Sequence, residues 1–238
     1  MIKVFIGYDS REAVAYSVLA HSINVRASQP VSTMPIMISQ LGGIYTRERH
    51  PLQTTDFSFS RFLTPYLCDY QGWALFMDCD MLFRDDIAKL WALRDERYAV
   101  QVIKHEHVPT ETTKFMNQPQ TRYEKKNWSS VMLFNNAKCR ALTPEFVNTA
   151  SGLELHQFKW LGDDSLIGAL PHRWNHLVGY DAYSADAANV HYTSGGPYFT
   201  QYANCEYATE WLVDRNAMLE VNNTRHEKAA PAPLKAAG

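Results

Sequence analysis

Residues 73–83 read Trp-Ala-Leu-Phe-Met-Asp-Cys-Asp-Met-Leu-Phe, and this stretch decides the fold class of the 238-residue chain. Its first five residues are all apolar, as is typical of a strand that is buried on both faces of a parallel sheet. The apolar run ends abruptly at Asp78. Because α/β sheets bind ligands beyond the carboxyl ends of their strands, we expect a functional site at this position.

Two carboxylates stand at that strand end. Asp78 and Asp80 are two residues apart, so an extended chain points both side chains the same way. Like charges this close repel, and a divalent cation relieves the repulsion while adding affinity for phosphate oxygens. Carboxylate ligands favour Mg²⁺ or Mn²⁺. An isolated D-x-D is more often a solvated strand end, but apolar residues on both sides of this one favour a metal site.

Strands and helices alternate around this stretch, which predicts an α/β fold. The chain opens with an apolar run over 2–7, and a helical pattern over 13–20 follows it. A long polar segment over 105–127 is a candidate binding loop. In the segment 57–67 we expect Pro65 to kink the end of a helix. The other expected elements are strands over 34–38, 98–103 and 130–135, and helices over 57–67, 87–93, 144–149, 163–169 and 207–219.

The composition is that of an ordinary folded protein, with 46% hydrophobic and 20% charged residues. Its 23 basic and 25 acidic residues give a formal net charge of -2, so we expect no nucleic-acid partner. Four cysteines without a C-x-x-C pair argue against a cysteine-based zinc site and against a disulfide framework. With no signal peptide or membrane-spanning run, these features predict a cytoplasmic protein, while peripheral membrane contact stays open.

Several motifs, in the right order, resemble the glycogenin and lipopolysaccharide galactosyltransferase-like family of GT-A glycosyltransferases. The resemblance covers roughly residues 1–200. The matching segments are Tyr8-Asp9 after the first strand, Phe59-Ser60-Arg61-Phe62, the D-x-D stretch 73–83, residues 127–135, Gly162-Asp163-Asp164-Ser165, residues 170–175, and Val190-His191-Tyr192.

The resemblance implies a GT-A fold, which is a Rossmann-like, mixed, mostly parallel sheet flanked by helices. It also implies a metal-dependent hexosyltransferase that uses a nucleotide-sugar donor, with UDP favoured, and retains the anomeric configuration. His191 would be the third metal ligand beside Asp78 and Asp80. The implied donor-binding residues are Gly7, Tyr8, Asp9, Arg61, Asp78, Cys79, Gly195 and Gly196, and those on the acceptor side are Asn127, Ser129 and Ser130.

The chain departs from the family in two places. The family follows its metal histidine with a lysine that reaches the diphosphate, and this chain lacks it. Backbone amides at Gly195 and Gly196 are one substitute, and side chains of the long loop are another. The loop candidates are Lys104, Lys114 and Arg122. The family also has Asp-Gln where this chain has Asp163-Asp164, so Asp164 is a candidate nucleophile or charge-stabilising carboxylate, unless the pair only caps a helix.

These features predict one domain over residues 1–221 and a flexible tail over 222–238. The acceptor stays open among glycans of surface polysaccharide, lipid-linked glycans and proteins. Two alternatives are a nucleotide-sugar-binding protein without catalytic activity, suggested by the missing lysine, and a phosphatase that uses a D-x-D motif. The phosphatase is disfavoured because such enzymes usually carry this motif near the N-terminus.

Overall fold

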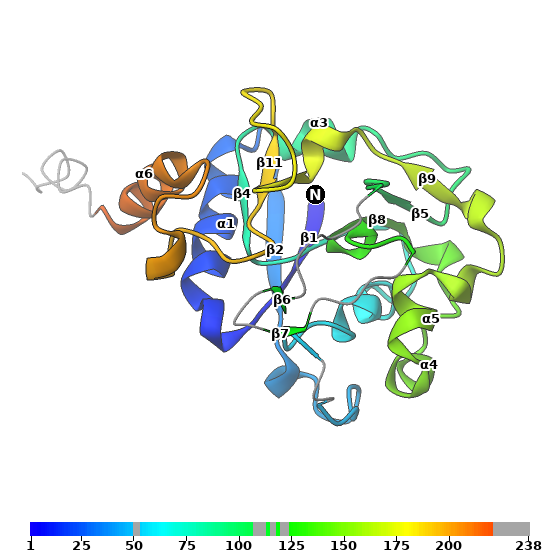
Figure 1. The fold of residues 1–238 in the computed structure, drawn as a ribbon. Coiled ribbons are helices and arrows are strands. Elements are labelled where there is room, and N and C mark those ends of the chain that lie inside the picture. The colour runs from blue at the N-terminus through cyan, green and yellow to red at the C-terminus, as the bar shows by residue number, and fades with distance from the viewer. Residues whose placement is uncertain (50–52, 107–112, 115–117, 120–123, 221–238) are drawn as a thin grey trace, which may run out of the picture.

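A six-stranded mixed sheet forms the centre of the protein (Figure 1). The computed structural model describes residues 1–49, 53–106 and 124–220, together with the backbone of residues 113–114 and 118–119. The strands lie in the order β2 (Val31–Ile36), β1 (Ile2–Gly7), β3 (Trp73–Met77), β8 (Val131–Asn135), β5 (Val100–Val102) and β9 (Ile167–Ala169). All of these strands run parallel except β8, so the predicted mixed, mostly parallel sheet is confirmed.

The reversed direction of β8 brings two parts of the sequence together. Met77, the last residue of β3, pairs with Val131, the first residue of β8. The residue that follows β3 therefore meets the residue that precedes β8, and the backbone N–H of Asp78 donates to the carbonyl of Ser130 at 3.0 Å. This antiparallel pair places the segment 127–130 beside the D-x-D motif.

A small second sheet continues from the D-x-D motif. It consists of β10 (His176–Leu177), β11 (Asn189–His191) and β4 (Met81–Phe83), and β4 begins directly after Asp80. β11 runs antiparallel to β4, with His191 opposite Met81. The motif is therefore the connection between the two sheets, and the register of β11 brings His191 to it.

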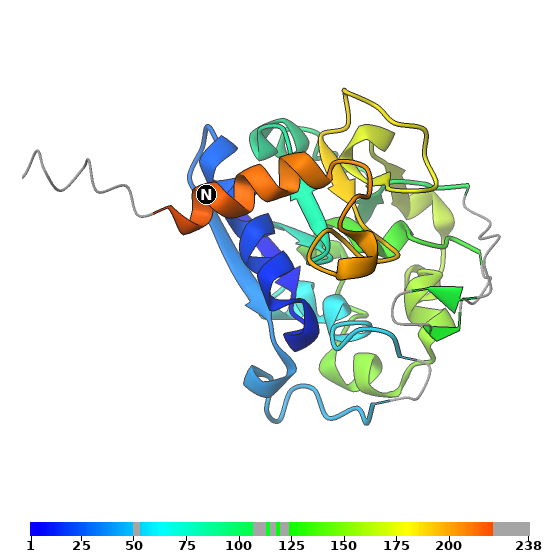
Figure 2. The ribbon, with the colours of Figure 1, turned by 60° about the vertical axis from the view of Figure 1, so that its left-hand side comes forward.

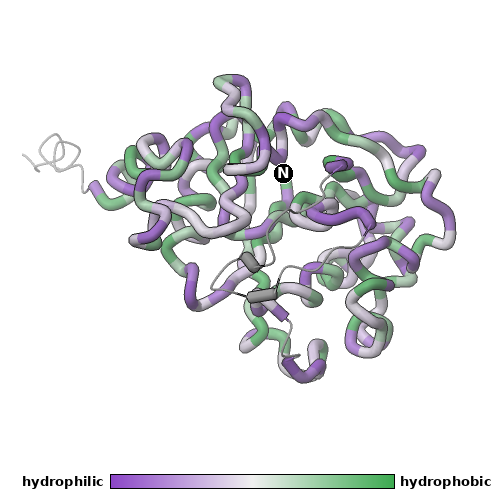
Figure 3. Tube along the Cα trace, viewed as in Figure 1, coloured by the Kyte–Doolittle hydropathy of each residue, from purple (hydrophilic) through white to green (hydrophobic). Residues whose placement is uncertain are grey.

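Helices pack around the two sheets. They are α1 (Ala13–Arg26), α2 (Thr64–Leu67), α3 (Ile87–Trp91), α4 (Pro144–Thr149), α5 (Gly152–His156) and α6 (Ala208–Leu219). α6 crosses α1 on one side of the molecule (Figure 2), where Arg26 forms an ion pair with Asp214 at 3.0 Å. Hydrophobic and hydrophilic residues alternate along much of the trace (Figure 3), and β1, β3 and β8 supply much of the buried core. Within the described residues, no helix is long and apolar enough to span a membrane.

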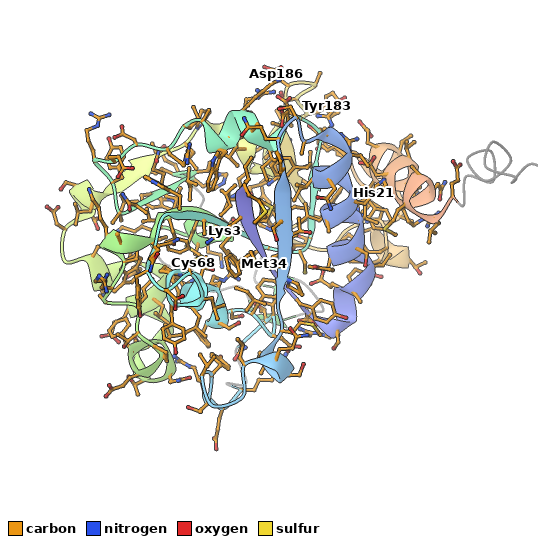
Figure 4. The ribbon with its side chains drawn as sticks, turned by 180° about the vertical axis from the view of Figure 1, so that it is seen from behind. Lys3, His21, Met34, Cys68, Tyr183 and Asp186 are labelled. Carbon is orange, nitrogen blue, oxygen red and sulfur yellow. The ribbon has the colours of Figure 1, made fainter. Side chains whose placement is uncertain are left out.

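One predicted strand has other bounds than expected. The strand expected over 34–38 is β2, which begins at Val31 and ends at Ile36. Figure 4 views β2 from behind, where Met34 lies on this outermost strand. Pro35 is tolerated there because an edge strand does not need its N–H for a second neighbour.

The helices expected over 57–67 and 163–169 differ from the observed structure. The first is a 3-10 turn (Ser60–Leu63) followed by α2, and Pro65 lies in the first turn of α2, where its missing N–H costs nothing, rather than kinking the end. The second is a 3-10 turn (Asp164–Leu166) followed by β9. β9 packs closely on Tyr98, since a Cβ atom at Gly168 would lie 2.5 Å from that ring. Tertiary pairing with β5 thus overrides the local helical signal.

The remaining elements largely agree with expectation. α3, α4, α6, β5 and β8 lie within or close to their predicted ranges, and Thr143 caps α4 by accepting from the N–H of Phe146. The long segment expected as a loop contains two short strands, β6 (Thr113–Lys114) and β7 (Gln118–Pro119). α5 was not predicted, although the capping box formed by Ser151 and Glu154 is a sequence signal for its start. The predicted tail over 222–238 lies outside the described residues.

Candidate functional site

Asp78 is held by a buried arginine. The guanidinium of Arg61 donates to the Oδ1 atom of Asp78 at 2.7 Å and to the backbone carbonyl of Ser129 at 2.8 Å. The same guanidinium lies over the ring of Phe76, 5.1 Å from its centroid. Arg61 is 5% exposed, so its charge requires these partners. The helix segment that carries Arg61 therefore fixes one carboxylate of the D-x-D motif.

Asp80 and His191 complete a cluster with Asp78. One ligand atom from each of the three residues lies within 4.8 Å of the other two. The Nε2 atom of His191 is 3.3 Å from the Oδ1 atom of Asp80, an ion-pair contact that lacks the geometry of a hydrogen bond. Burial lowers the pKa of His191, but the nearby Asp80 carboxylate more than offsets this, so its pKa lies above the ordinary value.

The orientation of His191 is set by a chain of hydrogen bonds. Its Nδ1 atom lies 2.9 Å from the Oδ1 atom of Asn175, whose Nδ2 group donates to the hydroxyl of Ser130 at 2.8 Å. That hydroxyl donates to the backbone carbonyl of Asn127 at 2.6 Å. Asn127 has a left-handed backbone with φ 65°, which asparagine tolerates. Asn127 and Ser130, assigned from sequence to the acceptor side, thus support the imidazole of His191.

These three side chains fit a divalent cation. The Oδ1 atom of Asp80 is buried and accepts no hydrogen bond from the described residues, although such an atom normally has a partner. With Nδ1 of His191 bonded to Asn175, its Nε2 atom faces the carboxylates, as in most metal-binding histidines. Two carboxylates and one imidazole suit Mn²⁺ or Mg²⁺.

A buried carboxylate that sequence reasoning missed lies next to this cluster. Glu12 is 1% exposed, accepts from the hydroxyl of Tyr198 at 2.7 Å and lies 4.0 Å from the sulfur of Cys79. Burial and the charge of Asp80 raise the pKa of Glu12 to about 8. Burial also raises the pKa of Cys79, which keeps its thiol protonated. The sequence carries no signal for Glu12, because acidic residues are common at helix starts.

The residues at the end of β1 make close contacts with neighbouring segments. A Cβ atom at Gly7 would lie 2.3 Å from the ring of Phe57, so glycine allows this close approach. The buried Asp9 carboxylate accepts from the backbone and side chain of Arg11 and from the N–H of Asp56. Tyr8 is partly buried and packs edge-on against Tyr16. Asp9 therefore ties the segment before Arg61 to the end of β1.

The substitutes suggested for the missing phosphate lysine receive mixed support. Gly195 has a φ of 122°, but its N–H already donates to the carbonyl of Tyr192 at 2.8 Å. At Gly196, a Cβ atom would lie 2.5 Å from the ring of Tyr198, so glycine is needed for packing. Lys104 is exposed and lies over the ring of Trp128. The side chain of Lys114 and the whole of Arg122 lie outside the described residues.

Asp163 and Asp164 are exposed and lie outside the cluster of Asp78, Asp80 and His191. Asp163 caps the 3-10 turn, since its side chain accepts from the N–H of Ser165 at 2.8 Å. This turn is much shorter than the helix that the capping alternative assumed. The Asp164 carboxylate is 71% exposed and lies 2.5 Å from the Nζ atom of Lys125.

Ser129 faces another histidine. Its hydroxyl lies 2.7 Å from the Nδ1 atom of His156, the last residue of α5. The ring of His156 packs edge-on against Phe62, next to Arg61 in sequence. This contact joins the turn before β8 to the end of α5.

No protein-family profile matches the chain. A close relative is nevertheless found among curated proteins. Protein CDI of Arabidopsis thaliana is 47% identical to this chain over 236 residues, which cover 95% of this chain and 90% of Protein CDI.

Solved structures share the fold at low sequence identity. LgtC, a galactosyltransferase crystallised with donor and acceptor sugar analogues, is 13% identical, with a TM-score of 0.55 over 95% of this chain and 100% of LgtC. The glycosyltransferase GlyE of Streptococcus pneumoniae is 13% identical, with a TM-score of 0.60 over 100% of this chain and 67% of GlyE. WbbM, a bifunctional glycosyltransferase, is 12% identical, with a TM-score of 0.62 over 90% of this chain and 49% of WbbM.

The likeness to these glycosyltransferases extends along nearly the whole chain. At this identity it establishes the architecture and leaves the chemistry to the residues of this chain. The chain has the GT-A glycosyltransferase fold, and it belongs to the same family as Protein CDI of Arabidopsis thaliana.

Proposed function

We propose that the protein is a metal-dependent glycosyltransferase that moves a sugar from a nucleotide sugar to an acceptor hydroxyl. The observation that carries the proposal is the meeting of Asp78, Asp80 and His191 at the junction of the two sheets. Asp78 and Asp80 lie in the turn between β3 and β4, and His191 is the last residue of β11. Their donor atoms suit one divalent cation. The cluster lies in a fold that glycosyltransferases share.

Each residue of the cluster has a proposed role. Asp78, Asp80 and Nε2 of His191 would hold Mn²⁺ or Mg²⁺, while Asn175 keeps the imidazole in place. When bound, the cation supplies positive charge that stabilises a departing nucleoside diphosphate. Arg61 keeps the Asp78 carboxylate in position and contributes its own positive charge beside the cluster.

The donor and acceptor sides are proposed from the resemblance to GT-A glycosyltransferases. We infer a UDP-hexose donor and transfer with retention, bound by the loop after β1, the D-x-D turn and the segment around Gly195 and Gly196. Ser129 and Asn127 would line the acceptor side at the start of β8. Asp164 remains the candidate for a carboxylate near the sugar, with Lys125 holding it through the 2.5 Å contact. Residues 1–221 would form the single catalytic domain.

The main test is donor turnover by the purified chain. We expect release of UDP from UDP-hexoses in the presence of Mn²⁺, even without an acceptor, because many transferases slowly hydrolyse their donor. The variant Asp80→Ala should remove the Mn²⁺-dependent turnover and leave the circular dichroism spectrum unchanged. Asp186→Asn, on the exposed surface that Figure 4 labels, is the matched control. Full turnover by a folded Asp80→Ala protein would overturn the metal assignment.

A separate variant tests the role of Asp164. Asn has nearly the shape of Asp but cannot act as a nucleophile. If Asp164 attacks the anomeric carbon, Asp164→Asn should lose nearly all transfer while keeping donor affinity. If the variant keeps nearly all activity, the nucleophilic role is excluded and front-side displacement is left as the mechanism.

The second candidate function is binding of a nucleotide sugar without catalysis. It is favoured by the absence of a lysine between His191 and Tyr198 and by the ion pair that engages Asp164. Tight Mn²⁺-dependent binding of UDP-hexose, measured by thermal shift, with no hydrolysis and no transfer would support it. The phosphatase alternative receives no support from the comparisons, because LgtC, GlyE and WbbM are all glycosyltransferases. Phosphate release from a simple ester without a nucleotide would revive it.

A further inference from the structure

A second cluster of potential metal ligands lies outside the D-x-D site. It consists of His105, His172 and Asp181, and one ligand atom from each lies within 4.8 Å of the other two. None of the three was assigned a role from the sequence. Together they offer two imidazoles and one carboxylate, a set that differs from the two carboxylates and one imidazole of the first cluster.

The three ligands come from separate parts of the chain. His105 lies just beyond β5, where its backbone carbonyl accepts from the indole N–H of Trp128 at 3.0 Å. His172 begins a 3-10 turn (His172–Trp174) after Pro171. Asp181 follows β10 in a turn closed by its own backbone N–H, which donates to the carbonyl of Leu177 at 2.9 Å. Each backbone is therefore fixed before any ion binds.

The side chains are also partly arranged for binding. The rings of His105 and His172 are 4.9 Å apart at their centroids and nearly perpendicular. The Nε2 atom of His172 lies 3.4 Å from Oδ2 of Asp181. That carboxylate oxygen also accepts from the N–H of Leu177 at 2.7 Å. Hydrogen bonds of this kind commonly orient the side chains that bind a metal. A distance near 3.4 Å is close to what two ligands of one tetrahedral Zn²⁺ ion span.

The three side chains differ in their exposure to solvent. His105 is buried, whereas the side chain of His172 is 52% exposed and that of Asp181 is 23% exposed. The exposed side chains of His172 and Asp181 therefore give an ion access from solvent. Two neutral imidazoles with one carboxylate and an open position form a donor set that Zn²⁺ uses in proteins.

We propose that His105, His172 and Asp181 form a second metal site, selective for Zn²⁺ or a similar transition metal over Mn²⁺ and Mg²⁺. Imidazole-rich sites favour Zn²⁺, while carboxylate-rich sites favour the harder ions. A bound ion would join the end of β5, the turn that leads to Asn175, and the turn after β10. The proposal does not rest on the proposed transferase activity.

The test separates this site from the first one by using the Asp80→Ala protein as the background. Full-length protein is dialysed against Zn²⁺, and the bound metal is counted by elemental analysis. Substitution of Co²⁺ then reports the coordination through its visible absorption. We expect one tightly bound Zn²⁺ per chain in Asp80→Ala, and a tetrahedral or five-coordinate Co²⁺ spectrum.

Two further variants assign the ligands. Adding His172→Ala to this background should weaken Zn²⁺ binding by about tenfold or more, because outer-shell losses alone cost this much. Adding His21→Ala, a change on α1 outside the cluster (Figure 4), should leave the affinity unchanged. Thermal melts without metal check that each variant folds.

Other results would overturn the proposal. Absence of tight Zn²⁺ binding in the folded Asp80→Ala protein would show that the cluster is not a metal site. Equal affinities in the His172→Ala and His21→Ala variants would assign the bound zinc to surface histidines. A preference for Mn²⁺ over Zn²⁺ at the remaining site would contradict the inferred selectivity.

Discussion

The Nδ1 atom of His191 lies 2.9 Å from the Oδ1 atom of Asn175, and both side chains are buried. Because the amide of Asn175 donates its N–H to Ser130, its oxygen is left to accept from His191. The proton of neutral His191 then sits on Nδ1, and Nε2 carries the lone pair that faces Asp80. We predict that Asn175→Ala lowers Mn²⁺ affinity by about 10–100-fold.

Isothermal titration of Mn²⁺ into the folded variant measures this change. Asn216→Ala, an exposed change on α6, serves as the control and should bind Mn²⁺ as the unaltered protein does. Unchanged affinity in Asn175→Ala would mean that other contacts orient the imidazole.

The affinity for Mn²⁺ should rise with pH. The Asp80 carboxylate raises the pKa of His191 above the ordinary value of 6.5, against the opposing effect of burial. Below that raised pKa, the imidazole holds a proton on the nitrogen that binds the metal, so binding must release it. Titrations between pH 6 and 9 should therefore show affinity that increases with pH and then levels off. Affinity that is flat across neutral pH would contradict a histidine ligand.

Glu12 should make the protein less stable as the pH rises. Its pKa is raised to about 8 in the folded state, against an ordinary value of 4.5. The folded state therefore holds one more proton than the unfolded state between these values, and stability falls by up to about 1.4 kcal/mol per pH unit in that window. Glu12→Gln should flatten this dependence in thermal melts with a chelator present. Glu220→Gln, at an exposed position, should not.

Gly7→Ala should destabilise the fold, because the added Cβ atom would meet the ring of Phe57 at 2.3 Å. Overpacking of this kind costs about 1–3 kcal/mol, which urea unfolding detects. Gly42→Ala is the matched control, since no atom lies within 4 Å of a Cβ placed there. The double variant Gly7→Ala/Phe57→Leu should recover part of the loss. A destabilisation as small as that of Gly42→Ala would show that the ring moves aside freely.

The sequence alone predicted the parts of the fold that depend on local pattern. The apolar run before Asp78 identified β3, and the two-residue spacing placed Asp80 beside Asp78 without further information. His191 follows more than a hundred residues later, so only the family resemblance could link it to them. Its partner Asn175 lay inside a matched motif, but no spacing rule joins the two side chains.

Other features required tertiary contacts. The segment after Asp163 carries a helix-start signal, but Gly168 fits closely against Tyr98 and the chain pairs with β5 as a strand. Glu12 occurs in an ordinary helix-start context, and only packing shows that it is buried beside Cys79. The second histidine cluster likewise depends on turns that fold together from distant segments.

The antiparallel direction of β8 also affects how the segment before it can vary among related proteins. The segment between β5 and β8 leads directly into the residues that touch Arg61 and Asp78, since Ser129 and Ser130 lie at its end. The strands β3 and β11, which lead to the cation cluster, are held by pairing with β1 and β4. Under the proposed function, exchange of the segment 106–124 between relatives would change the acceptor while the cation cluster is inherited intact.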